Sequence, residues 1–296
     1  MLDEQGRVIE TSRQPTPAGA DALVDTVGRL LDELSAPLGG DREVTLGVGL
    51  PGSITKAGVI TSSPHLPDVT EFDAAGALTD RQRRPVTVAN DANCAVMAEW
   101  THGAGRGVDD VIMITLGTGI GGGIIAGGRL LLGAHGHAGE FGHMMVEPDG
   151  LECPCGQRGC WERYASGSAV MVEARRRAAA SLGAPVESAA TIEAITSEQV
   201  VQLALAGDVA AMAVLDHVAR WLAIGLANLT NAFDPARFVL GGGLSEAPAS
   251  FEPALRREMA DRVYASEVRR PPDIRMAELG ERAGAIGAAL LGSPAD

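Results

Sequence analysis

The sequence is poor in aromatic residues and in positive charge. Phenylalanine, tryptophan and tyrosine make up 3% of its 296 residues, so the core has to be built from aliphatic side chains. Acidic residues outnumber basic ones by 38 to 24, which gives a formal net charge of −14 at pH 7. A nucleic acid presents dense phosphate charge and requires a basic surface, so this balance argues against a nucleic-acid partner.

The first residues lack the basic segment, apolar run and small-residue cleavage site of a secretory leader, so we expect a cytoplasmic protein. One stretch, 111–134, has the length of a membrane span and a single charge, at Arg129. Its glycines and β-branched residues are poor helix formers and favour strands. We therefore predict a buried hairpin here and no membrane partner.

Cysteine is also scarce, and three of the four cysteines lie together in HAGEFGHMMVEPDGLECPCGQRGCWE, residues 137–162. Three thiolates and one imidazole form the ligand set of a closed tetrahedral zinc site. Disulfides or plain buried thiols are the alternatives, but Cys153 and Cys155 are too close in sequence to pair comfortably. A Pro- and Gly-rich loop with little apolar material is typical of a segment ordered by metal. We predict structural Zn²⁺ bound by His143, Cys153, Cys155 and Cys160.

Two carboxylates accompany this loop. Glu140 and His143 are three residues apart, so a helical turn would put them on one face. Glu162 follows Cys160 by two residues, so the metal loop would also fix its position. A metal-bound imidazole offers its second N–H as a donor, and together with two acceptors this would suit a polyol. Support for the metal itself is the competing interpretation.

The remaining chain reads as an α/β protein long enough for two domains. An amphipathic helix is expected over 18–38, and a strand over 43–50 runs into a glycine-rich turn at 47–52. A second strand, 84–89, delivers Asn90 and Asp91 to its carboxyl end, where open α/β sheets bind ligands. Asp91 could instead cap the helix predicted at 94–100.

Two glycine clusters follow strands. Residues 115–123 contain G-x-G-x-x-G, but a second strand follows instead of the helix that a dinucleotide fold requires. Such a turn still presents backbone N–H groups to a phosphate. A strand over 237–240 enters the second cluster, Gly241-Gly242-Gly243, and a helix is expected over 253–264. Apolar helices are predicted over 209–233 and 283–291.

These motifs together resemble the ROK family of sugar kinases (repressors, open reading frames, kinases), and most closely its actinobacterial glucokinases. The resemblance rests on HAGEFGH with CPCGQRGCWE, then VANDANC, TLGTGIGGG and VLGGGLS, and covers nearly the whole chain. It implies an actin-like (ribonuclease H-like) two-domain sugar kinase fold. The expected domains are 1–109, completed by 283–296, and 110–282 with the zinc loop.

The resemblance also implies roles for single residues. Asp91 is the expected general base, which takes the proton from the 6-hydroxyl of a hexose as it attacks the γ-phosphate of ATP with Mg²⁺. The hexose that the resemblance implies is glucose. The other expected sugar contacts are Gly49, Asn90, Glu140, His143 and Glu162. The expected contacts of the ATP phosphates are Gly117, Thr118 and Gly119, and those of the adenosine are Gly241, Gly242 and Gly243. A homodimer or homotetramer is expected.

One departure from the family pattern is the absence of the D-x-G-G-T-type phosphate turn and its strand, so the first domain lacks its first strand. Either the start lies upstream of Met1, or the chain binds sugar and zinc but transfers phosphate poorly. The alternatives to a glucokinase are therefore a catalytically impaired sugar sensor and a kinase for fructose, mannose or an N-acetylhexosamine. The phosphate donor, ATP or polyphosphate, stays open.

Overall fold

The computed structural model describes residues 1–38, 44–63, 66, 69–182 and 190–292. The chain forms two compact units. Unit 1 comprises Met1–Met113, Gly123–Gly139 and Glu278–Asp296, and unit 2 comprises Ile114–Gly122 and Glu140–Ala277. Residues 123–139 thus join unit 1, although the predicted limits assigned them to the second domain. Those limits stay a prediction.

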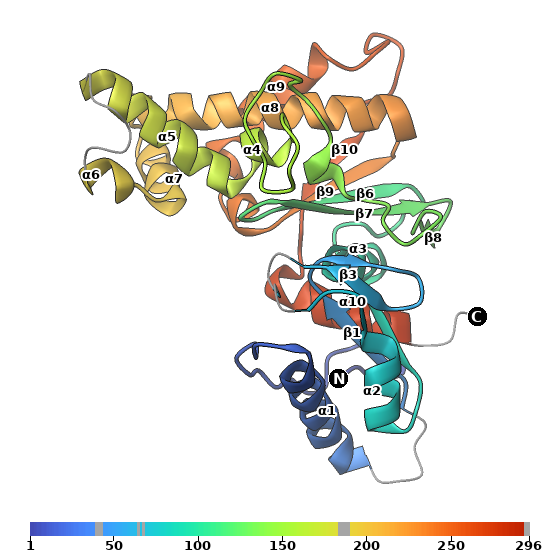
Figure 1. The fold of residues 1–296 in the computed structure, drawn as a ribbon. Coiled ribbons are helices and arrows are strands. Elements are labelled where there is room, and N and C mark those ends of the chain that lie inside the picture. The colour runs from blue at the N-terminus through green and yellow to red at the C-terminus, as the bar shows by residue number, and fades with distance from the viewer. Residues whose placement is uncertain (39–43, 64–65, 67–68, 183–189, 293–296) are drawn as a thin grey trace. The chain divides into compact units, whose positions relative to one another are not determined.

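Unit 1 contains two small sheets. Strands β1 (Leu46–Leu50) and β5 (Val86–Asn90) pair in parallel, with Leu50 opposite Asn90. Strands β2 (Ser53–Ile54), β3 (Val59–Ser62) and β4 (Phe72–Asp73) form an antiparallel sheet. Helices α1 (Ala20–Ser35) and α2 (Ala74–Gln82) pack against each other (Figure 1). The side chains that form the core here are aliphatic, as the composition predicts: Leu23, Leu46, Val48, Leu50, Ile54, Ile60, Val69, Leu78, Val86 and Val88.

Helices α3 (Asp91–His102) and α10 (Ala283–Gly292) pack on each other, and α10 also packs on β1. Glycine makes this approach close. A Cβ atom added to Gly287 would lie 1.6 Å from the carbonyl oxygen of Cys94, and one added to Gly47 would lie 1.7 Å from that of Ala288. Residues 47–50 therefore belong to β1, as the predicted strand has it, and the overlapping glycine-rich turn predicted at 47–52 begins only after Leu50. Position 43 of the predicted strand lies outside the described residues.

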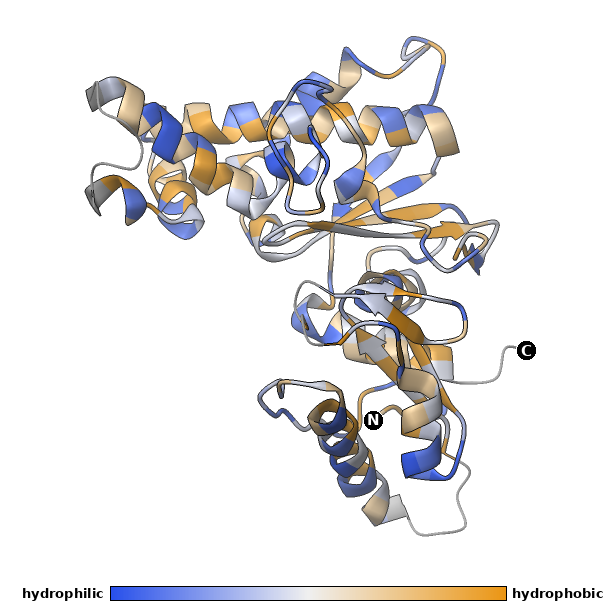
Figure 2. Ribbon diagram, in the orientation of Figure 1, coloured by the Kyte–Doolittle hydropathy of each residue, from blue (hydrophilic) through white to orange (hydrophobic). Residues whose placement is uncertain are grey.

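A sheet of five strands has the order β10-β9-β6-β7-β8. The predicted hairpin is confirmed as β6 (Val111–Leu116), β7 (Ile120–Ala126) and β8 (Arg129–Leu130). Strands β6 and β7 are largely buried and carry mostly apolar side chains and glycine (Figure 2). Strands β9 (Arg237–Gly241) and β10 (Asp273–Met276) are parallel, and β10 was not predicted.

The helices of unit 2 centre on α8 (Val209–Phe233), whose bounds match the prediction. Asp208 caps its start by accepting the Ala211 N–H over 2.8 Å. Its end lies at Asp234, in the left-handed region at φ 49° and directly before a proline. The other helices are α4 (Glu162–Ala165), α5 (Gly167–Leu182), α6 (Ala190–Glu193), α7 (Ser197–Leu205) and α9 (Glu252–Ala260).

Among the described residues, α8 is also the one helix long and apolar enough to cross a membrane by length and composition. Half of its most apolar window is buried inside the fold. The apolar residues along its middle, such as Leu215, Leu222 and Leu226, are fully buried, as expected for the core helix of a globular unit.

Candidate functional site

The four predicted metal ligands lie together in unit 2. One ligand atom from each of His143, Cys153, Cys155 and Cys160 can be chosen so that all lie within 4.8 Å of one another. The Sγ atoms of Cys155 and Cys160 are 3.6 Å apart, and His143 Nδ1 lies 4.0 Å from Cys153 Sγ. Thiolates bound to zinc at tetrahedral angles lie about 3.8 Å apart. The donor set and its spacing therefore fit a tetrahedral zinc ion.

The loop that carries these ligands is held by short-range backbone bonds. Isolated antiparallel bridges join Met145 to Cys160 and Glu152 to Arg158. The Cys153 N–H donates to Gln157 O over 2.8 Å, which closes a tight turn between the first and last cysteines. Burial raises the pKa of the Cys153 thiol to about 12. Metal binding at this cysteine therefore releases a proton.

Glu162, the first residue of α4, connects the metal cluster to the first glycine turn. Its Oε1 accepts a hydrogen bond from the Cys153 thiol over 3.3 Å, and its Oε2 accepts one from the Ile120 N–H over 3.4 Å. A Cβ atom added to Gly119 would lie 2.4 Å from Oε2. The Glu162 carboxylate can therefore approach the turn only because residue 119 is glycine.

The two glycine clusters of unit 2 are neighbours. Gly117 and Thr118 are exposed at the end of β6, and the Gly117 N–H donates to Gly119 O over 3.1 Å. At the end of β9, Gly242 is exposed with φ 83°. A Cβ atom added to Gly242 would lie 2.6 Å from the carbonyl oxygen of Leu116, the residue before the first cluster. The residues predicted to bind nucleotide therefore share one edge of the sheet.

Glu140 directly precedes a single turn of 3-10 helix, Phe141–His143, of which His143 is the last residue. The His143 N–H donates to Glu140 O over 3.2 Å. Both side chains are exposed. Because Nδ1 of His143 faces the cysteines, Nε2 is the nitrogen left for another partner. The predicted helical turn between the two residues is confirmed, with a tighter helix than expected.

The unit 1 candidates gather at the carboxyl ends of β1 and β5. Asn90 Oδ1 accepts from the N–H groups of Ala92 and Asn93, so Asn90 caps α3. Its Nδ2 donates to Gly52 O over 3.0 Å. Asp91 is the first helical residue and is exposed, with Oδ1 bonded to the Ala92 N–H. The helix-cap interpretation considered for Asp91 therefore applies to Asn90, which leaves Asp91 a carboxylate that faces solvent.

Two further polar side chains in unit 1 were not singled out from the sequence. Ser63 and Asn93 are 5% and 2% exposed, and within the described part of the chain neither Ser63 Oγ nor Asn93 Oδ1 has a hydrogen-bond partner. Ser63 lies beside Gly52, since a Cβ on that glycine would be 2.7 Å from Ser63 Cβ. A serine directly before a proline gives no sequence signal for such a role.

The fourth cysteine, Cys94, lies in unit 1 beside Gly49, where a Cβ on the glycine would be 3.1 Å from Sγ. Burial, and then the charge of Asp91, raise the pKa of Cys94 to about 12. It is thus a protonated, buried thiol at neutral pH, and it fills space beneath the predicted sugar contact.

Comparison with known proteins identifies the family. The model of the ROK family matches residues 1–294. The chain belongs to the ROK family. It is 36% identical to a glucokinase of Streptomyces coelicolor, over 100% of this chain and 94% of that protein.

A ROK glucokinase of Streptomyces griseus, solved in complex with glucose and AMPPNP, superposes with a TM-score of 0.82 at 38% identity. The match covers 98% of this chain and 93% of that one, so the predicted actin-like sugar kinase fold is confirmed. ROK relatives also include regulators: the xylose repressor of Bacillus subtilis is 28% identical over 97% of this chain, which spans 69% of that protein.

Proposed function

We propose that this chain is an ATP-dependent glucokinase that transfers the γ-phosphoryl group of ATP, with Mg²⁺, to the 6-hydroxyl of glucose. The observation that supports it best is the position of Glu162. One carboxylate touches a metal ligand through Oε1 and a glycine turn through Oε2. A carboxylate in this position would hold a sugar hydroxyl at a fixed place relative to the backbone that binds phosphate. Phosphoryl transfer depends on such positioning of the two bound substrates.

The sugar contacts of unit 2 are proposed as Glu140, His143 and Glu162. The bound zinc would supply no chemistry beyond ordering the loop and orienting the imidazole of His143. It would also take the place of the Cys153 proton, which leaves Oε1 of Glu162 to accept from another donor, such as a sugar hydroxyl. Carboxylates that each need a hydroxyl partner discriminate strongly against an analogue without it.

In unit 1 we propose Asp91 as the general base, with Asn90 and Gly49 beside the sugar. Asn90 uses one amide hydrogen for Gly52 and retains a second to donate. The carboxylate of Asp91 is exposed at the start of α3, where an entering hydroxyl can reach it and donate its proton. A positioned carboxylate base contributes about 10²–10⁴-fold to a rate. Ser63, whose buried hydroxyl has no hydrogen-bond partner among the residues that the structure describes, is a further candidate contact.

The nucleotide would lie along the shared edge of β6 and β9, with the phosphates at Gly117–Gly119 and the adenosine at Gly241–Gly243. Gly117, Thr118, Gly242 and Gly243 are exposed there, so their backbone groups are accessible to a ligand.

The test is a panel of glucose, mannose, fructose and N-acetylhexosamines with Mg²⁺ and either ATP or polyphosphate. We expect glucose with ATP to give the highest kcat/KM. Asp91→Asn should retain glucose binding by calorimetry and lose turnover by at least about 10²-fold. Glucose binding without turnover in the unaltered chain would instead favour the sugar-sensing role of the repressor relatives.

A further inference from the structure

Tyr164 connects the tip of the metal loop to the helical part of unit 2. It lies in α4, two residues after Glu162. Its hydroxyl accepts a hydrogen bond from the Leu151 N–H over 2.6 Å. The residue before Leu151 is Gly150, and a Cβ atom added there would lie 1.9 Å from the Tyr164 hydroxyl, so the phenol requires glycine at this position. The phenol therefore occupies a fitted position under the loop tip, Gly150–Leu151.

The ring of Tyr164 packs on α8 through Trp221. The two ring centroids are 4.5 Å apart, with an angle of 36° between the planes. Trp161, on the preceding turn, is fully buried and donates its indole N–H to the carbonyl oxygen of Trp221 over 2.8 Å. Two aromatic residues of the α4 segment thus attach to one position of α8. Aromatic pairs at this separation stabilise a fold beyond their buried area.

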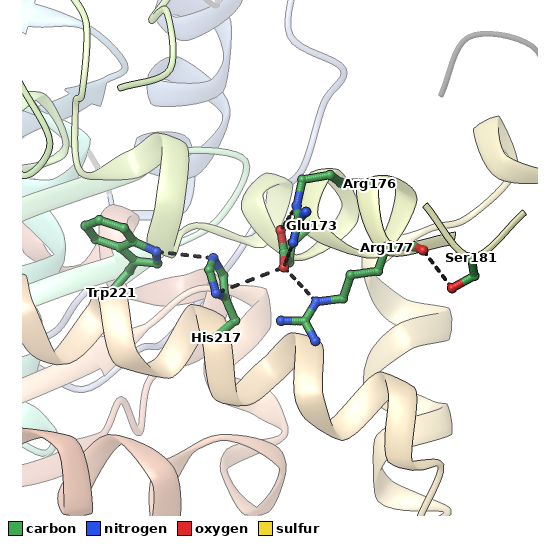
Figure 3. Close-up of polar contacts among 6 residues, drawn as sticks. All are labelled: Glu173, Arg176, Arg177, Ser181, His217 and Trp221. Carbon is green, nitrogen blue, oxygen red and sulfur yellow. Dashed lines mark hydrogen bonds and ion pairs between the residues drawn. The ribbon is translucent and has the colours of Figure 1, made fainter. Parts of the chain in front are cut away.

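Trp221 is itself held by a polar network that Figure 3 shows. Its indole N–H donates to His217 Nε2 over 3.2 Å, so a neutral His217 carries its proton on Nδ1, 4.0 Å from Glu173 Oε1. Burial lowers the pKa of His217, which favours this neutral form although the charge of Glu173 opposes it. Burial disfavours the charge of Glu173 as well, but hydrogen bonds from Arg176 and Arg177 outweigh it and lower its pKa to about 2.

The bonds that order the metal loop internally do not fix it to α8. The Val146 N–H donates to Gly159 O, the Gly159 N–H to Leu151 O, and the Arg158 guanidinium to Gly150 O. All of these partners lie within the loop. The hydrogen bond from Leu151 to Tyr164 is different, because it joins the loop tip to a residue that is stacked on α8.

We propose that Tyr164 is a positioning residue for the sugar and metal sites. By holding Leu151 on one side and Trp221 on the other, it fixes the loop tip relative to α4. This keeps Cys153 Sγ within 3.3 Å of Glu162 and preserves the orientation of that carboxylate. The proposal rests on the proposed zinc site and sugar contacts. It states that Tyr164 controls the geometry of both sites, although its phenol would contact neither the zinc nor the sugar.

The test is Tyr164→Phe, which removes the hydroxyl and keeps the ring. The chain offers a matched control, because its second tyrosine, Tyr264, is 79% exposed. We expect Tyr164→Phe to release zinc to an excess of chelator about 2- to 10-fold faster, the size of one net hydrogen bond. The KM for glucose should rise by a similar factor with kcat within about twofold. The proposal is overturned if Tyr164→Phe releases zinc at the same rate as Tyr264→Phe and has the same KM for glucose.

A second pair of variants tests the ring contact. Trp221→Phe keeps an aromatic ring against Tyr164, whereas Trp221→Leu does not, so zinc release should be faster in the leucine variant. Equal release from the two variants would refute a role for stacking. Thermal melts of all variants distinguish a loosened loop from a misfolded chain.

The positioning role can be tested apart from the metal. If elemental analysis finds no zinc in the unaltered chain, the proposed metal site fails, but tryptic cleavage after Arg158 still reports on the loop. Tyr164→Phe should then be cleaved faster than Tyr264→Phe, since the loop tip has lost its attachment. Cleavage at equal rates would overturn the positioning role whatever the metal content.

Discussion

Replacing Gly119 by alanine tests whether Glu162 binds sugar. The added Cβ atom would lie 2.4 Å from Glu162 Oε2, whereas real Cβ contacts are essentially never shorter than 3.0 Å. The carboxylate would therefore have to recede by about 0.6 Å or more. Its bond to the Ile120 N–H, already 3.4 Å long, would then break. The backbone need not move, because the obstacle is the end of a flexible side chain, so the fold should keep its stability.

The expected effect is on glucose affinity. A hydrogen bond to a charged group contributes about 1.5–3 kcal/mol, so misdirecting the Glu162 carboxylate should weaken glucose binding by about 10- to 100-fold. Calorimetric titration with glucose in the absence of nucleotide measures this directly. It also separates the effect from any change in the binding of ATP phosphates to the same turn.

Gly117→Ala is the matched control, because it makes the same change two residues away and no heavy atom lies within 4 Å of its added Cβ. We expect its glucose affinity to stay within about twofold of the unaltered chain. If Gly119→Ala also binds glucose normally, Glu162 is not a sugar ligand. If both variants lose affinity equally, the turn itself and not the displaced carboxylate is responsible.

Further predictions follow from unit 1, the metal loop and the buried carboxylate. Gly287→Ala should lower the free energy of unfolding by about 2 kcal/mol or more, measured by urea titration, because its Cβ meets a backbone carbonyl at 1.6 Å. Gly284→Ala in the same helix should not lower it, because its Cβ has open space and alanine is the better helix former. Cys153→Ser should abolish stoichiometric zinc by elemental analysis, and Cys94→Ser should retain it. Glu173 has a pKa of about 2, below its ordinary 4.5, so its stabilising contribution is complete above pH 4.5 and is lost as pH falls towards 2. The stability difference between Glu173→Gln and the unaltered chain should therefore shrink between pH 7 and pH 3.

Features with local chemical signals could be predicted from the sequence. Helix α8 begins after Asp208 and ends before a proline, and both ends give strong signals. The metal ligands lie close in the chain, so their spacing alone indicated the cluster. The link between Glu162 and Gly119 could not be predicted, because it depends on where α4 places a side chain relative to a turn 43 residues earlier.

The errors have different causes, and one of them is that tertiary contacts override local preference. Gly47 and Gly49 suggested a turn, but glycine in β1 is needed for the approach of α10. Helix α9 was expected to reach Tyr264 and ends at Ala260, where the N–H groups of the next turn bond back to Met259. No glycine or proline marks that end. Asn90 and Asp91 both suit a helix cap, and sequence alone does not say which one supplies it.

The close approach of Gly242 to Leu116 couples the end of β6 to the end of β9, so that neither can move without the other. Any side chain at 242 would push on the last carbonyl of β6 and so disturb both turns at once, whereas position 243 has open space around it. Evolutionary change on this edge should therefore accumulate at 243 and spare 242. A laboratory library randomised at both positions should recover diverse residues at 243 and glycine alone at 242.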